Sequence, residues 1–376
     1  MSTLTDSELG GMMQLVRGTQ WYVGMFGDAY ALVLRGQADD PSPFYAAARE
    51  RGMHQNLLGT WVVAGHELGR QILADPRFGV RKADGTPAAQ QVLPLENSYL
   101  GLDAADRERL LRQAAAEFGP DAVGRHRAVA EGVCEQLLGA IDGPFDLVGD
   151  FAFPVAVRTL AQLLGIEDDE RFAGYCAAVG IAQDALLSPQ RLAPARELVD
   201  ALDGLGEQLR ESGKHGDSLA AAVLLVVHGV PAVTSLVTNA VLALGDQRPD
   251  PALAPKVVAE TLRFDPPEHV RTVVAHTDVE IGGNTVAADS QVAVLLAAAN
   301  RDPEVYADPD HFDIHRQGPD PLAPQGELAA PLARFTAEAA LSTLLTTFPT
   351  FSVEAPVLRR RRSPVTRGVL RATVRP

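Results

Sequence analysis

Cysteine is scarce in this sequence, which has only Cys134 and Cys176 among its 376 residues. Two cysteines are too few for a disulfide scaffold, and their spacing forms no Cys-x-x-Cys metal or redox motif. A cationic, apolar leader is also lacking, because Asp6 and Glu8 stand where a signal peptide needs positive charge. We therefore expect a cytoplasmic protein.

Positive charge is in deficit as well. Lys and Arg number 33 against 48 Asp and Glu, which gives a net charge of −15 and a pI near 5.0. A surface of this sign repels phosphates, so no nucleic-acid partner is expected. With 46% hydrophobic residues and a mean hydropathy of +0.01, the chain is too apolar to be disordered and can bury a large core.

Long uninterrupted apolar runs are missing too. Residues 219–244 form the most apolar stretch, but the purely apolar run ends at Val227 and is followed by His228 and Pro231. This pattern predicts a long buried core helix and no membrane span. Neither internal repeats nor Gly/Ser-rich linkers divide the chain, so we expect one domain over residues 1–376.

The hydrophobic periodicity predicts a mainly α protein with a small β part. Most of the first two thirds has helical spacing, and short β-branched runs follow, which predict a small antiparallel sheet. The predicted elements are helices over 103–166, 252–263 and 330–347, strands over 270–274, 279–281 and 292–296, and a hairpin over 353–374.

Five motifs follow one another in a fixed order in the last third of the chain. They are Glu260-Thr261-Leu262-Arg263 before a Pro-Pro turn, Ala298 to Pro303, His311 to Arg316, Ala330 to Arg334, and Arg359 to Gly368. In this order they resemble the cytochrome P450 family, and the resemblance runs from about Asp40 to the end. It implies a cytochrome P450 fold.

The E-x-x-R motif also has a meaning that needs no family name. Glu260 and Arg263 share a helix face at i, i+3, and Arg316 can reach the same carboxylate once the chain folds back. We expect a partly buried structural network of these three residues. The spacing alone also allows an ordinary exposed helix pair.

The family's metal ligand is absent. P450s hold haem iron with a cysteine thiolate in a Gly-rich loop just before the helix that starts here near Ala330. Residues 317–329 contain neither Cys nor His, and no cysteine follows Cys176. We therefore expect a P450 fold without haem, with no catalytic, cofactor-binding or metal residues. His315 is the nearest substitute ligand, and a solvated surface histidine is the commoner outcome.

The proton-delivery pair of the family is missing as well. Its acid and threonine fall here near Pro231 and Ala232, neither of which can relay a proton, and Pro231 is expected to kink the helix. His228 is more typical of a hydrogen-bonded core residue than of a catalytic one.

The propionate-binding positions of the family are partly kept. Arg107 stands where the family has histidine, while Arg109 and Arg271 match its arginines. We expect these guanidinium groups to be solvated or paired with carboxylates.

Across its whole length the chain resembles P450 homologues that lack the haem cysteine and assist glycosyltransferases of macrolide and anthracycline antibiotic biosynthesis. Residues 13–21, 27–30 and 60–64 fit that group better than true P450s. The resemblance implies a pseudoenzyme that binds and activates or stabilises a cognate glycosyltransferase. That partner would transfer a deoxysugar from a nucleotide sugar to a polyketide aglycone, in a heterotetramer of two plus two chains.

Residues 1–35 are the predicted partner-contact segment. Four of the five methionines lie among the first 25 residues, next to aromatic side chains, and flexible thioethers with an aromatic anchor suit a contact surface. We expect Met12, Met13 and Trp21 to touch the glycosyltransferase. The alternative is that the segment packs on its own body.

Two other functions remain open at this point. One is a binding protein that holds an apolar small molecule in the vacated haem cavity. The other is a haem monooxygenase with unusual ligation.

Overall fold

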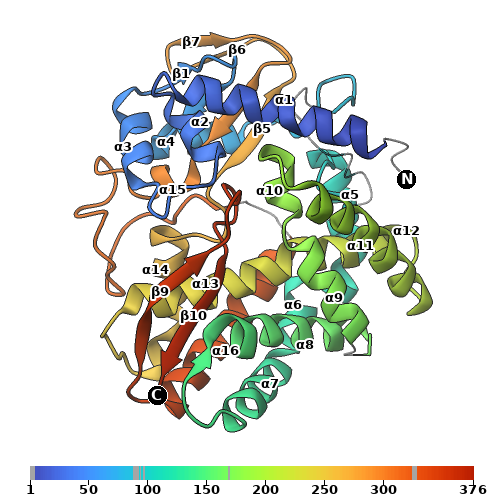
Figure 1. The fold of residues 1–376 in the computed structure, drawn as a ribbon, viewed down its shortest axis with the longest axis vertical. Helices are drawn as coiled ribbons and strands as arrows, with labels where there is room; N and C mark the ends of the chain where they lie inside the picture. Colours follow the sequence, from blue (N-terminus) through green and yellow to red (C-terminus); the bar gives the residue numbers. More distant parts are fainter. Residues whose placement is uncertain (1–4, 88–92, 94, 96–97, 168–169, 324–327) are drawn as a thin grey trace.

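The computed structural model describes residues 5–87, 93, 95, 98–167, 170–323 and 328–376. A large helical body occupies the middle and C-terminal parts, and a smaller mixed region carries the main sheet (Figure 1). The helices are α1 Asp6–Gly24, α2 Ala29–Leu34, α3 Ser42–Glu50, α4 His66–Ala74, α5 Ala104–Phe118, α6 Pro120–Gly124, α7 Arg127–Gly139, α8 Phe153–Leu164, α9 Glu170–Val179, α10 Ala182–Leu187, α11 Leu192–Glu211, α12 Gly216–Leu224, α13 Val230–Leu244, α14 Ala254–Phe264, α15 Leu296–Ala299 and α16 Ala329–Thr347.

The main sheet has the strand order β1-β2-β8-β5-β3, with strands at His54–Gln55, Trp61–Val63, Gln291–Val294, Arg271–Ala275 and Phe78–Gly79. Strand β2 pairs with β8 in parallel, whereas the other pairs are antiparallel. The predicted antiparallel sheet is therefore corrected to a mixed one. Its missing strands come from the first eighty residues and are only two or three residues long, too short for a periodic signal.

Two smaller sheets complete the β part. Strands β6, Val279–Ile281, and β7, Asn284–Val286, form a hairpin. The C-terminal hairpin pairs β9, Ser352–Arg359, with β10, Val369–Arg375, and β10 also pairs with β4, Phe145–Asp146. The tip of the C-terminal hairpin reaches up beside α2 and α10 (Figure 1).

The central helix of the body consists of α12, a π-helical turn over Leu225–Gly229 and α13. Pro231 is the second residue of α13 and has no backbone N–H, so the ordinary hydrogen-bond pattern cannot run through it unchanged. The helix is apolar enough to cross a membrane, but 78% of its most apolar window is buried in the protein. Leu147–Leu164 passes the same test of length and composition, and 61% of its window is buried.

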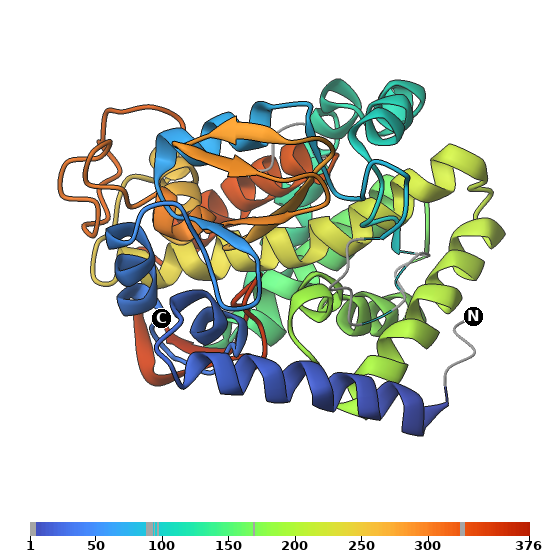
Figure 2. The same ribbon diagram turned by 90° about the horizontal axis from the view of Figure 1, so that it is seen from above.

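Helix α1 lies along one outer edge of the molecule (Figure 2). A capping box begins it, in which the Thr5 hydroxyl accepts from the Glu8 N–H and the Glu8 carboxylate accepts from the Thr5 N–H. One face carries the buried residues Leu9, Met13, Gln20 and Val23. Its other face is covered by no described element (Figure 2).

Candidate functional site

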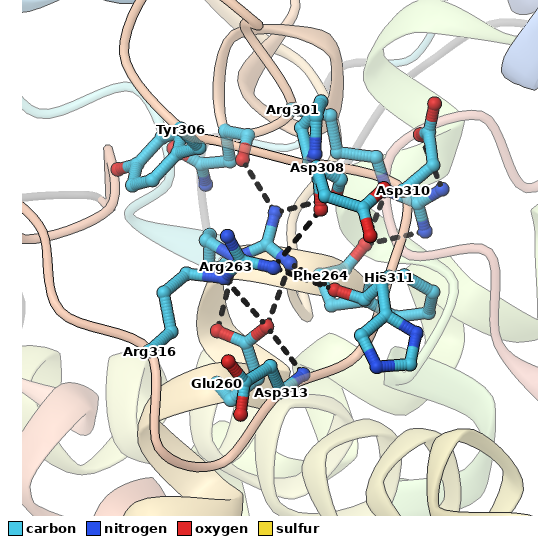
Figure 3. A network of polar contacts seen from close by, with 12 residues as sticks. Glu260, Arg263, Phe264, Arg301, Tyr306, Asp308, Asp310, His311, Asp313 and Arg316 are labelled. Carbon is cyan, nitrogen blue, oxygen red and sulfur yellow. Dashed lines mark hydrogen bonds and ion pairs between the residues drawn. The ribbon is translucent and has the colours of Figure 1, made fainter.

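The E-x-x-R helix holds a buried ion network (Figure 3). Arg263 meets both oxygens of Glu260, with Nε 2.9 Å from Oε2 and Nη2 2.7 Å from Oε1. Arg316 comes from the loop after α15, and its Nε lies 3.2 Å from the same Oε1. The structure thus brings together the three residues that the spacing suggested. The Glu260 and Arg263 side chains are only 5% and 3% exposed, so this is not an ordinary surface pair.

Every N–H of the Arg263 guanidinium has an acceptor. Besides the two bonds to Glu260, Nη1 donates to the carbonyls of Asn300 and Pro309, and Nη2 donates to that of His311. A buried ion pair stabilises a fold only when its remaining donors are satisfied in this way. The network therefore anchors the loop that follows α15 to α14.

A second buried polar chain starts at the end of α14. Nε2 of His269 lies 3.0 Å from the Asp265 carboxylate, and its Nδ1 lies 2.9 Å from the Tyr45 hydroxyl. Burial lowers the pKa of His269 below its ordinary value of 6.5, although Asp265 opposes that shift. Burial alone would raise the pKa of Asp265, but His269, Arg359 and Arg367 together hold it below its ordinary range.

Helix α5, the central helix and the start of α16 converge at the place where the resemblance would put haem. Leu110 and Leu111 of α5, Leu224 of the central helix and Leu328 beside α16 line a residual space of only about 20 Å³. That volume holds one or two water molecules. Arg107, His228 and Ala329 complete the lining of this small space.

Two of the three cations at the propionate-binding positions, Arg109 and Arg271, have carboxylate partners. Arg109 Nη1 lies 2.7 Å from Asp217 at the start of α12. Arg271 forms a two-pronged pair with Glu268, at 2.6 and 2.8 Å. Arg107 lines the small space at α5 and donates to the carbonyl of Leu102. Arg109 and Arg271 thus form ion pairs with carboxylates of this same chain.

A pocket lined by both apolar and polar side chains lies beside Arg271. Gln183 of α10 hydrogen-bonds Nδ1 of His228, and both side chains line this pocket together with Glu268 and Gln291. Its accessible interior is about 90 Å³, below the ~300 Å³ at which sites for drug-sized ligands begin. His228 is thus a partly buried, hydrogen-bonded residue of the helix.

None of the candidate iron ligands is placed to serve. Cys134 on α7 is fully buried, and burial raises the pKa of its thiol to about 12. Cys176 is buried on α9, and His315 is exposed. Within the described ranges, no group of three His, Cys, Asp or Glu side chains could hold a metal ion. Residues 324–327 of the loop predicted to lack a ligand lie outside the described residues.

The N-terminal segment differs from the sequence prediction. Met13 is 2% exposed and packs in the main core, so its side chain cannot reach a partner, which corrects the prediction for that residue. Met12 is partly buried against the same core. Trp21 is 45% exposed, with the Arg35 guanidinium 4.3 Å above its ring.

Sequence analysis missed a buried carboxylate that ties the hairpin to the helical body. Asp184 of α10 accepts hydrogen bonds from the hydroxyls of Ser363 and Thr366 and from the N–H groups of Val365 and Thr366, at 2.6 to 3.0 Å. Burial raises the pKa of Asp184, while these four donors favour its charged form. No local pattern could have paired residues about 180 positions apart.

Comparisons with known proteins agree with this architecture. The family model described as "Cytochrome P450" matches residues 246–320. The chain is 39% identical to Protein DesVIII of Streptomyces venezuelae (99% of this chain, 94% of that one) and 36% identical to Protein AknT of Streptomyces galilaeus (98% and 95%). It is 35% identical to the Cytochrome P450 family protein EryCII of Saccharopolyspora erythraea, over 100% of this chain and 99% of that one.

A relative named as an enzyme is less similar. The Cytochrome P450 monooxygenase PikC of Streptomyces venezuelae is 29% identical over 84% of this chain and 86% of its own. Among solved structures, ligand-free CYP164A2 of Mycobacterium smegmatis superposes with a TM-score of 0.80 and 26% identity, covering 93% of this chain and 99% of that one. The mainly helical fold with its small β part is thus the one shared by these proteins.

Proposed function

This chain belongs to the cytochrome P450 family, and we propose that within it the chain is a haem-free auxiliary protein that binds and activates or stabilises a glycosyltransferase. The partner would transfer a deoxysugar from a nucleotide sugar to a polyketide aglycone in antibiotic biosynthesis. Full-length similarity to DesVIII, AknT and EryCII, together with lower similarity to a monooxygenase, supports an auxiliary role.

One observation carries the proposal, namely that the donor set at the expected haem position does not fit haem. The sequence has no cysteine after Cys176, and residues 317–329 contain no histidine. Leucines from three elements line the small space there, together with Arg107 and His228, whose Nδ1 is hydrogen-bonded to Gln183. Arg109 and Arg271 pair with Asp217 and Glu268. Without a thiolate ligand, the O–O cleavage of the family has no site.

The same geometry argues against a cavity-binding role. A vacated haem cavity able to hold an apolar aglycone would need ~300 Å³ or more. The space between α5, the central helix and α16 is about 20 Å³, and the pocket beside Arg271 is about 90 Å³. A third space, between α9, the start of α13 and the C-terminal hairpin, is about 200 Å³. These volumes favour a role carried out by the protein surface.

Activation needs no catalytic residue on this chain. If the glycosyltransferase alone populates its active state poorly, a protein that binds only that state stabilises it by mass action, by about 2.7 kcal/mol at a hundredfold excess over Kd. The auxiliary protein is then stoichiometric and is not consumed. Two auxiliary chains and two transferase chains would form the assembly.

The test is sugar-transfer turnover by the glycosyltransferase encoded beside this gene, measured while purified auxiliary protein is titrated in. We expect stimulation that saturates near one auxiliary chain per transferase chain. The maximal stimulation should be the same when the auxiliary protein is expressed in cells that cannot make haem. The matched control is heat-denatured auxiliary protein. An active transferase that shows no stimulation, or stimulation that requires haem, would contradict the proposal.

A further inference from the structure

Exposed apolar side chains gather on one helix. The described residues include eight exposed large hydrophobic side chains, and five of them lie between positions 15 and 26. Leu15, Tyr22, Met25 and Phe26 are 63% to 78% exposed, and Trp21 is 45% exposed. The Tyr22 and Phe26 rings contact each other edge to face, at 5.1 Å between centroids. We call these five side chains the α1 patch.

The segment that carries this patch has few charged residues. Between Glu8 and Asp28 the sequence contains one charged residue, Arg17, although the whole chain has 48 acidic residues and a net charge of −15. A solvated surface helix normally carries charged residues on its outer face. An outer face that exposes large aromatic and aliphatic side chains, with Gln14 and Thr19 as uncharged polar members, therefore indicates a contact surface.

One edge of the patch carries clustered arginines. The Arg35 guanidinium lies over the Trp21 ring and donates to the Trp21 carbonyl. Arg17 donates to the Gln190 carbonyl at 3.0 Å, and the Gln190 side chain donates to the Arg362 carbonyl at 2.9 Å. Arg17 and Arg191 are near enough to Arg362 to lower the pKa of its guanidinium further, beyond the effect of burial.

Among the described residues, no carboxylate pairs with these arginines. Within the part of the chain that the structure describes, none of Arg17, Arg35, Arg191 and Arg362 forms an ion pair, whereas Arg109, Arg263 and Arg271 all do. Nε of Arg35 and Nη1 of Arg362 are also buried without an acceptor. On a strongly acidic protein, the cluster of Arg17, Arg191 and Arg362, with Arg35 on the Trp21 ring, calls for carboxylates from outside.

We infer that the α1 patch and the neighbouring arginines together form a docking surface. The segment that docks there is an acidic and apolar part of the glycosyltransferase, so this inference rests on the proposed function. The segment would place apolar side chains over Tyr22 and Phe26 and carboxylates against the arginines. A second copy of this chain fits less well, because it would bring the same arginine cluster and another net −15 to the interface.

The test measures the Kd between the purified glycosyltransferase and variants of the full chain. Phe26→Glu and Tyr22→Glu should each weaken binding about tenfold or more, because they bury a charge at the centre of the contact. Leu57→Glu is the matched control, since Leu57 is 66% exposed, like Phe26 at 64%, but lies outside the patch. The control should bind as the wild type does.

The arginines are tested by salt dependence. Arg191→Glu should weaken binding severalfold at low salt and flatten the loss of affinity with added salt. Arg112→Glu, a reversal in an exposed pair on α5, should leave both unchanged. Circular dichroism and unfolding midpoints should match the wild type for all five variants.

Each outcome decides a separate point. A wild-type complex that tolerates Phe26→Glu and Tyr22→Glu overturns the docking surface and leaves the proposed function standing. Absence of any wild-type complex overturns both. Self-association of the wild type that Phe26→Glu abolishes, with unchanged transferase binding, assigns the patch to a second copy and overturns the inference.

Discussion

Leu332 of α16 lies directly against Gly229 of the central helix, where an added Cβ would come within 3.1 Å of Leu332 Cδ2. The same glycine position faces Ala329 at 3.7 Å. The start of α16 and the turn before α13 are thus in van der Waals contact. In the resemblance, these are the two elements between which haem would lie.

We therefore predict that the protein does not take up haem. Purified protein, incubated with haemin and then reduced under carbon monoxide, should show no Soret band. Leu328→Cys, which offers a thiol beside the start of α16, should behave in the same way because the space there is about 20 Å³. A catalytic P450 treated in parallel is the control, and a stoichiometric Soret band in the wild type would refute the prediction.

Removing Arg263 should destabilise the fold strongly. Arg263→Ala leaves Glu260 buried with one cation and strips three carbonyls of their donor, so we expect a loss of about 3–5 kcal/mol in the free energy of unfolding. Arg263→Lys should recover only part of it, since an ammonium has three donors where the guanidinium uses five.

Urea unfolding gives the measurement for the Arg263 variants. Arg112→Ala breaks an exposed pair and is the control, with a loss of at most about 0.5 kcal/mol. A loss below about 1 kcal/mol for Arg263→Ala would show that the network contributes little.

Stability should fall as the pH drops below about 6.5. Burial lowers the pKa of His269, so the unfolded chain binds a proton there that the folded chain does not. The stabilisation is complete above the ordinary value of 6.5 and is lost at up to about 1.4 kcal/mol per pH unit below it. Asp265, whose pKa is also lowered, adds a further loss near its own ordinary range.

The variant His269→Gln isolates this contribution. Its unfolding free energy should depend less steeply on pH between about 6.5 and about 5.5 than that of the wild type. His315→Gln removes an exposed histidine and should leave the slope unchanged. Equal slopes for wild type and His269→Gln would mean that His269 titrates normally in the folded protein.

Asp184→Ala should loosen the hairpin tip from α10. The substitution leaves the buried donors of Ser363, Val365 and Thr366 without their shared acceptor, and each unsatisfied donor costs roughly 1–3 kcal/mol. We expect a loss of at least about 2 kcal/mol and faster proteolysis after the arginines of residues 359–362. Asp121→Ala, on the short helix α6, is the control. Unchanged proteolysis at the hairpin tip would argue against the tether.

Local sequence patterns located several elements well. Strand β6 occupies Val279–Ile281 as predicted, α16 starts one residue before the predicted position, and the hairpin spans 352–375 against a predicted 353–374. In each case the signal is local, because it consists of the periodicity of the element itself and the turn residues next to it in the sequence. The spacing of Glu260 and Arg263 likewise predicted a pair, because one helix turn places them side by side.

Local patterns did not predict which segments far apart in the sequence pair with each other. Strand β2 finds its partner β8 about 230 residues later, and neither strand has a periodic pattern long enough to show that they pair in parallel. Met13 and Trp21 both looked like contact residues, yet Met13 faces the core while Trp21 faces Arg35 and solvent. Which face of α1 turns inward depends on α2 and α11, against which it packs.

The sequence by itself determined the family of this protein, its helical character and the absence of a thiolate ligand before α16, because motif order and missing residue types need no coordinates. Only the tertiary structure decided that leucines line a small space between α5, the central helix and α16. It also decided that four arginines without an ion pair among the described residues border an exposed aromatic patch. Packing and charge pairing arise between residues distant in the chain, and their geometry exists only once the helices have docked.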